Sequence, residues 1–145
     1  MALPLLHLPS TILLSKTQFP APDAIFAQHL KKGPAMYTIH FTFEEKDKAP
    51  KTVSSPPGDT LLEVALKNDI HLHHNCGGVC ACSTCHIYLE KGEDYVDEIT
   101  DKEEDFVDRA RNPKLSSRLA CQCLLDEGDG DVEVMIPDQS VILGE

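Results

Sequence analysis

The stretch CGGVCACSTCH, residues 76–86, places four cysteines within ten positions. Two more cysteines follow at Cys121 and Cys123, in the segment RLACQC. Thiols at such close spacing are typical of a metal site rather than of packing alone. Glycine and other small residues separate the first four, which favours a loop whose backbone adopts unusual dihedral angles and approaches a bound group closely. The stretch therefore predicts a metal-binding loop.

The spacing of the thiols distinguishes between metals. A Cys₄ zinc site usually consists of two C-x₂-C pairs, whereas this chain has one, Cys82 and Cys85. A [2Fe–2S] cluster takes four cysteine thiolates, typically three from one loop and one from a distant segment. The plant-type spacing C-x₄-C-x₂-C is absent, but C-x₅-C-x₂-C occurs once, starting at Cys76. The spacing leaves the fourth ligand open between Cys121 and Cys123.

Five segments around the loop have the character of β-strands. Residues 37–43 and 132–136 alternate apolar and polar side chains, which predicts strands with one buried face. Residues 51–55 predict a weaker strand that pairs with the first as a hairpin. Residues 86–90 predict a short strand directly after the cysteines, and the segment LACQCLL, residues 119–125, is a further candidate.

A helix is predicted on either side of the cysteine loop. Residues 60–69 begin with capping-box spacing at Thr60 and Glu63. Their expected apolar face consists of Leu62, Ala65 and Leu66.

The second helix is expected over residues 100–111. Thr100 and Glu103 repeat the capping-box spacing, and Pro113 stops the helix. The resulting order is β-β-α-loop-β-α-β-β, which predicts an α+β fold with a mixed sheet packed on one main helix.

At these residues the chain resembles the adrenodoxin-type [2Fe–2S] ferredoxins, which include mitochondrial ferredoxins and bacterial ferredoxins of iron–sulfur cluster assembly. The segments ACSTCH, ITDKEEDFVD and RLACQ occur in the family's order. The resemblance implies a β-grasp fold with a long cluster-binding loop and one [2Fe–2S] cluster per chain. It places the fourth ligand at Cys121, because the family's ligand directly precedes a glutamine, here Gln122. The implied ligands are Cys76, Cys82, Cys85 and Cys121.

Other residues near the loop have expected roles of their own. Cys80 and Cys123 are additional to the four ligands, and we expect both to be buried free thiols. The resemblance implies that His86 hydrogen-bonds within the structure and couples the loop to the rest of the domain. We expect the preceding histidines to be a solvated approach to the loop rather than a metal patch; they are His71, His73 and His74.

The resemblance implies a one-electron carrier and not an enzyme. It would receive electrons from an NAD(P)H-dependent ferredoxin reductase and pass them to iron–sulfur cluster assembly or to a haem monooxygenase. The sequence contains no GxGxxG or P-loop, so we expect no nucleotide site of its own. Two alternatives remain: a Cys₄ zinc module that serves as a protein-binding platform, and an iron–sulfur subunit of a larger oxidoreductase.

The charge distribution indicates the kind of partner. The net charge is −11 and there is no basic patch, which argues against nucleic acid. No apolar run is long enough for a membrane helix. Acidic residues gather in residues 90–108. The resemblance implies that a monomer docks there on a basic reductase and acceptor through Asp101, Glu103, Asp105 and Asp108.

The first 35 residues differ from the rest. They contain five of the ten prolines and no arginine. Prolines so distributed exclude a long helix. We expect a disordered N-terminal extension over residues 1–35, or coding sequence upstream of the real start at Met36, and a [2Fe–2S] ferredoxin domain over residues 36–145. The expected location is the bacterial cytoplasm. The alternative for the extension is a mitochondrial presequence, which would place the protein in the mitochondrial matrix.

Overall fold

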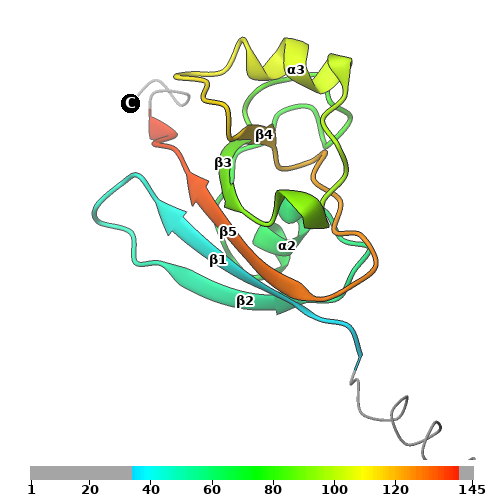
Figure 1. Ribbon diagram of the computed structural model, residues 1–145. Coiled ribbons are helices and arrows are strands. Elements are labelled where there is room, and N and C mark those ends of the chain that lie inside the picture. Colours follow the sequence, from blue (N-terminus) through cyan, green and yellow to red (C-terminus); the bar gives the residue numbers. More distant parts are fainter. Residues whose placement is uncertain (1–33, 141–145) are drawn as a thin grey trace, which may run out of the picture. The chain divides into compact units, whose positions relative to one another are not determined.

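The computed structural model describes residues 34–140, whose elements appear in Figure 1. The expected extension lies outside these residues, apart from its last two positions. The elements are β1 (Tyr37–Phe43), β2 (Lys51–Ser55), α2 (Leu61–Lys67), β3 (His86–Lys91), α3 (Asp101–Val107), β4 (Ser117–Leu119) and β5 (Gly130–Ile136), with a short 3-10 helix at Glu93–Tyr95. The 3-10 helix was not predicted, but the order of strands and α-helices is as expected. Within the described range, no helix has the length and apolar character needed to cross a membrane.

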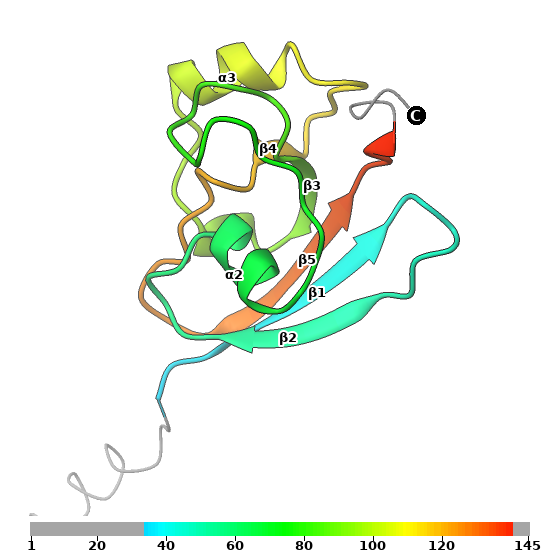
Figure 2. The same cartoon turned by 180° about the vertical axis from the view of Figure 1, so that it is seen from behind.

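The strands form one mixed sheet in the order β2-β1-β5-β3-β4. The central strand β5 runs parallel to β1, with Ile39 opposite Val132. The remaining pairs are antiparallel: β1 with β2, β3 with β5, and β3 with β4. Helix α2 lies across one face of this sheet (Figure 2). The predicted hairpin and the predicted sheet on one main helix are confirmed.

The core lies between α2 and the sheet. It is filled by the apolar side chains that occupy alternate positions of the strands. Tyr37, Ile39 and Phe41 of β1 are buried, as the period of two predicted. From β5, the same pattern buries Val132, Val134 and Ile136. Burying one such large apolar side chain stabilises a domain by about 1.5–3 kcal/mol, so this layer provides most of the hydrophobic stabilisation of the sheet.

The apolar face of α2 differs in part from the expectation. The capping box at Thr60 and Glu63 is present and fixes the start of the helix at Leu61. The buried side chains are then Leu61, Leu62, Val64 and Ala65, whereas Leu66 is 43% exposed. With one residue turning about 100°, the side chain at 66 lies far around the helix from those at 61 and 64. The prediction that Leu66 belongs to the core is wrong.

The predicted strand over residues 119–125 is also wrong for most of its length. Strand β4 covers only Ser117–Leu119, turns follow it, and Leu124 and Leu125 form only isolated antiparallel β-bridges, with Thr60 and Val96. Backbone carbonyls of this segment instead accept hydrogen bonds from the start of α2: Leu61 N donates to Cys123 O at 2.9 Å, and Leu62 N donates to Ala120 O at 3.0 Å. The helix thereby satisfies two of its otherwise unpaired N–H groups and holds the segment that contains Cys121.

Helix α3 is shorter than predicted and ends at Val107 rather than near Arg111. Thr100 Oγ1 accepts a hydrogen bond from Glu103 N at 3.2 Å, as the capping-box spacing predicts. The reciprocal bond from the Glu103 side chain is missing, because that carboxylate turns inward to Arg118. The second capping box is therefore only half formed.

Candidate metal centre

The backbone of the cysteine loop turns through left-handed conformations. Gly77 and Gly78 have φ angles of 67° and 88°, and Cys80 has a φ of 51°. Glycine adopts such angles without steric cost, whereas a side-chain-bearing residue is strained there. Cys80 is 3% exposed, so its surroundings hold it in this conformation. The small residues of the loop thus have the conformational role that the sequence predicted.

The two ends of the loop are tied together by side chains. Asn75 N donates to Thr84 Oγ1 at 3.0 Å. Gln139, from the segment after β5, donates from Nε2 to Thr84 O at 3.0 Å and accepts from His73 N at 3.1 Å. Gln139 is itself buried. These bonds fix the loop closure independently of any bound group.

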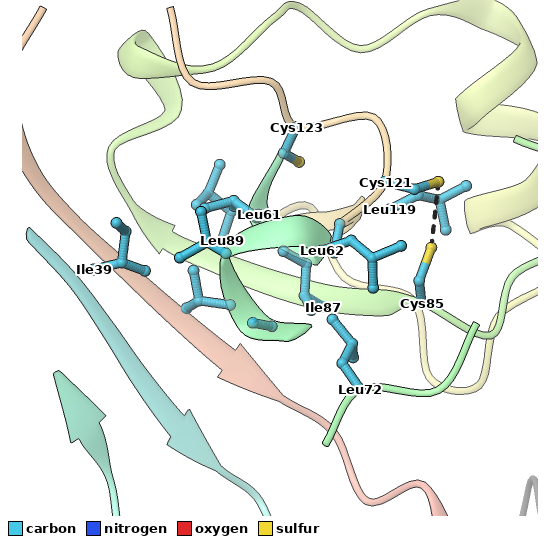
Figure 3. Close-up of a cluster of buried hydrophobic side chains, with 14 of the residues drawn as sticks. Ile39, Leu61, Leu62, Leu72, Cys85, Ile87, Leu89, Leu119, Cys121 and Cys123 are labelled. Carbon is cyan, nitrogen blue, oxygen red and sulfur yellow. Dashed lines mark hydrogen bonds between the residues drawn. The ribbon is translucent and has the colours of Figure 1, made fainter. Parts of the chain in front are cut away.

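One pair of sulfurs joins the loop to the distant cysteine segment. Cys85 Sγ donates to Cys121 Sγ at 3.4 Å, the contact drawn as a dashed line in Figure 3. This hydrogen bond lowers the pKa of Cys121 to about 6, even though burial opposes ionisation. The same bond, followed by burial, raises the pKa of Cys85 well above its ordinary value. The pair thus favours one thiolate at Cys121, the form that binds metal.

Cys82 lies within the loop. Burial opposes ionisation of Cys82, but hydrogen bonds from Thr84, from the Asn75 backbone and from the Cys76 side chain together lower the pKa of Cys82 to about 7. The Cys82 Sγ–Thr84 Oγ1 distance is 3.0 Å. Cys82 is therefore also prepared for the thiolate form.

The two additional cysteines, Cys80 and Cys123, lie buried, as expected. Cys123 points into the core among leucines, apart from the Cys85–Cys121 pair in Figure 3. Burial raises the pKa of Cys123 to about 12. Burial also raises the pKa of Cys80. Both side chains thus stay protonated near neutral pH.

The donor set consists of thiols from the loop and from the distant cysteine segment. The sulfurs of Cys85 and Cys121 are in contact, and a hydrogen bond from Cys76 helps to lower the pKa of Cys82. A [2Fe–2S] cluster held by four thiolates requires two sulfur ligands on each iron. The arrangement of these side chains matches that requirement.

The backbone and side-chain N–H groups around the sulfurs support the same conclusion. The side chain of Gln122 and the backbone of Cys80 help to lower the pKa of Cys121, and the backbone of Asn75 helps to lower the pKa of Cys82. Gln122 Nε2 lies 3.4 Å from Cys121 Sγ. Donors directed at sulfur stabilise negative charge, and a cluster with four thiolates is anionic.

His86 makes the hydrogen bond that was expected of it. Its Nε2 lies 2.8 Å from Ser117 Oγ, which also accepts from Lys114 N. Burial, reinforced by the charge of Lys114, lowers the pKa of His86 to about 4. The imidazole is neutral at physiological pH, and it links the residue after Cys85 to strand β4.

The expected docking face on α3 requires a correction. Asp101, Asp105 and Asp108 are exposed, as predicted. Glu103 is only 1% exposed, and its carboxylate accepts from Arg118 Nε at 2.9 Å and from Leu119 N at 2.9 Å. A buried carboxylate that is occupied by such partners cannot attract another protein, so the assignment of Glu103 to the docking face is wrong.

Two residues with a part in this region were missed from the sequence. Arg118 is buried with Glu103, and its position inside the apolar segment RLAC was the available signal. Lys102 donates from Nζ to Val79 O at 3.2 Å. This bond connects α3 to the outside of the cysteine loop, and no pattern in the sequence indicated it.

Comparisons with known proteins show which family of domains this chain is similar to. The family model described as "2Fe-2S iron-sulfur cluster binding domain" matches residues 44–126. A 2Fe-2S ferredoxin from Haemophilus influenzae is 45% identical over 85 residues, which cover 59% of this chain and 74% of the relative. The solved ISC-like [2Fe-2S] ferredoxin FdxB from Pseudomonas putida has 38% identity and a TM-score of 0.62, covering 69% of this chain and 91% of that one. A chain in the covalent putidaredoxin reductase–putidaredoxin complex has 25% identity and a TM-score of 0.59, covering 70% and 98%.

Proposed function

The chain belongs to the [2Fe–2S] ferredoxins, and from this premise we propose which residues hold its cluster and which proteins it serves. Its cofactor is one [2Fe–2S] cluster, and it is an electron carrier rather than an enzyme. Membership of this family replaces the zinc-platform alternative. When bound, the cluster takes up and releases one electron.

The proposed ligands are Cys76, Cys82, Cys85 and Cys121. The observation that carries this assignment is the 3.4 Å contact between Cys85 Sγ and Cys121 Sγ, two residues 36 positions apart. We assign Cys85 and Cys121 to one iron, because their sulfurs are in contact, and the two remaining ligands, Cys76 and Cys82, to the other. The position of Cys123, which is completely buried and lies apart from the Cys85–Cys121 pair in Figure 3, supports Cys121 as the fourth ligand.

The remaining residues of the loop control access to the site. Val79, at the outer side of the loop, is 65% exposed. A hollow of about 250 Å³, lined by Gly77, Gly78, Cys121 and residues of α2, lies beside it. This surface brings a partner within a short distance of the thiols, whereas the leucine core covers them from the inside. We propose that electrons enter and leave through the loop surface.

The proposed electron donor is an NAD(P)H-dependent ferredoxin reductase. A structural relative forms a complex with its own reductase, which supports a partner of this kind. The exposed acids of α3 supply a docking charge without Glu103: Asp101, Asp105 and Asp108. Opposite charges accelerate encounter without requiring tight binding, as a carrier that exchanges partners needs.

The proposed acceptor is the iron–sulfur cluster assembly machinery, and the proposed location is the bacterial cytoplasm. The ISC-like ferredoxin shares 38% of its residues with this chain, against 25% for putidaredoxin. The resemblance of the cysteine loop to bacterial ferredoxins of iron–sulfur cluster assembly also favours this acceptor. A haem monooxygenase is the alternative acceptor. The titration described next distinguishes between these two acceptors.

An anaerobic titration tests this function. The loaded protein is mixed with NADPH and a catalytic amount of a bacterial ferredoxin reductase, and the visible spectrum is followed. We expect the bands to bleach with one electron per chain and to recover when an assembly complex is added, more rapidly than with a haem monooxygenase. A colourless protein, or one that the reductase does not reduce, would contradict the proposal.

A further inference from the structure

We propose that the side-chain amide of Gln122 is a positioning residue that raises the reduction potential, through a hydrogen bond to the sulfur of Cys121. The inference rests on the proposed ligand role of Cys121. Gln122 directly follows that cysteine, and its side chain is half-buried over the loop. No other side-chain N–H in the described part of the chain has a recorded hydrogen bond to a ligand sulfur.

The amide nitrogen has three acceptors within reach. Gln122 Nε2 lies 3.4 Å from Cys121 Sγ, 3.2 Å from Cys121 O and 3.4 Å from Gly78 O. A primary amide has two N–H groups, so at least one of them is shared between two acceptors. The side chain therefore joins the distant cysteine segment to the glycine turn of the loop, and it places a donor on the sulfur between them.

The chemistry of its neighbours fixes which end of the amide faces the sulfur. All three neighbouring atoms are acceptors once Cys121 is a thiolate. Turning the amide by 180° would place its oxygen against two carbonyl oxygens and an anionic sulfur, which is repulsive. The orientation with Nε2 toward Cys121 is the one that satisfies the site.

A donor at this position affects the two redox states unequally. Reduction adds one electron, supplied by the reductase, and no bond to the protein is formed or broken. The reduced site carries one more negative charge, part of it on the ligand sulfurs, so an N–H···S bond stabilises the reduced state more than the oxidised state. Removing the donor should therefore make the protein harder to reduce.

Gln139 provides a matched control within the same loop. It is a second glutamine at the loop, itself buried, and it holds the loop through Thr84 O and His73 N. None of its recorded hydrogen bonds reaches a sulfur. Losing this amide should loosen the loop without removing charge stabilisation from a ligand.

The first experiment compares Gln122→Met with Gln139→Met by redox titration of the loaded proteins against a one-electron dye. Methionine retains the length of glutamine and removes the donor. We expect Gln122→Met to shift the equilibrium about three- to tenfold toward the oxidised form, or about 30–60 mV at 59 mV per tenfold change. Gln139→Met should lose its cluster faster on standing and should shift the equilibrium clearly less than Gln122→Met does. Equal shifts in the two variants would reduce Gln122 to a structural support and overturn the inference.

The second experiment uses Gln122→Glu, which retains the shape and does not depend on the methionine variant folding. A carboxylate at this position repels the sulfur, whereas its protonated form can donate as the amide does. The potential of this variant should rise as the pH falls through the pKa of the new carboxyl, relative to the wild type. A potential that follows the wild type at every pH overturns the inference. If the wild type itself binds no cluster, the proposed function fails instead.

Discussion

Arg118 Nε donates to Glu103 Oε1 at 2.9 Å, and both side chains are almost completely buried. Arg118 also donates from Nη2 to Asp97 O at 2.7 Å, and Glu103 accepts from the backbone N–H of Leu119. Burial alone would lower the pKa of Arg118. The hydrogen bond and the negative charge of Glu103 outweigh this effect of burial, so the pKa of Arg118 is raised. The pair connects α3 to the strand that leads into Cys121, so it is part of the framework that positions the fourth thiol.

Removing the Glu103 carboxylate should destabilise the domain strongly. Glu103→Ala leaves Arg118 buried without its partner, which costs about 3–5 kcal/mol. Asp105→Ala removes an exposed carboxylate from the same helix and should change stability by no more than about 0.5 kcal/mol. Thermal unfolding of the loaded proteins, followed by far-UV circular dichroism, measures both. Similar thermal unfolding midpoints for the two variants would contradict the buried pairing of Glu103 with Arg118.

Reversing the charge of the exposed acids should slow reduction by the reductase. Each exposed pair contributes about 0.2–1 kcal/mol, so Asp105→Lys combined with Asp108→Lys should lower the rate constant about three- to tenfold at low salt. The difference should shrink at high salt, because salt screens exposed charges. Stopped-flow reduction at two ionic strengths measures the effect, and the visible spectrum should stay unchanged.

A charge-matched control separates local docking from net charge. Asp47→Lys combined with Asp131→Lys changes the total charge by the same amount at exposed positions in the β1–β2 turn and on β5. This control should leave the rate nearly at the wild-type value. If both double variants slow reduction equally, the acids act through overall charge and α3 is not the docking face.

The buried thiol of Cys123 should make the domain sensitive to alkali. Its pKa is about 12 in the folded protein, against an ordinary value near 9. Between these values the folded state retains a proton that the unfolded chain has lost, so stability falls as the pH rises above 9, by about 1.4 kcal/mol per pH unit. Below pH 9 the contribution is fully present.

Cys123→Ala tests this dependence. The variant should be less stable at pH 8 because it leaves a small cavity, but its stability should fall less steeply above pH 9. Urea unfolding midpoints from pH 8 to pH 10.5 give the two slopes. Parallel slopes for wild type and variant would mean that Cys123 is not the titrating group.

The features predictable from the sequence are those that depend on local spacing. The thiols at 76, 82 and 85 form one loop, and the alternation around Ile39 and Val134 determines the buried strand faces. Both patterns follow from geometry over a few residues, so no knowledge of distant contacts was needed. The capping box at Thr60 is local in the same way and was also confirmed.

The features that escaped prediction depend on contacts between distant segments. Glu103 reads as one acid among many in an acidic helix, and only Arg118, fifteen positions later, accounts for its burial. The segment after Leu119 reads as a strand, but its carbonyls are taken by the start of α2 instead of a neighbouring strand. Similarly, the spacing could not decide between Cys121 and Cys123, because only the packed core shows which of them faces Cys85.

The most direct test of the account is the visible spectrum of two serine variants prepared side by side, Cys121→Ser and Cys123→Ser. Because Cys121 contacts Cys85 and Cys123 lies in the core, Cys121→Ser should lose or grossly alter the brown-red absorption of the loaded protein. Cys123→Ser should retain the wild-type spectrum at full iron content, with at most lower thermal stability. A bleached Cys123→Ser together with an intact Cys121→Ser would contradict the ligand assignment.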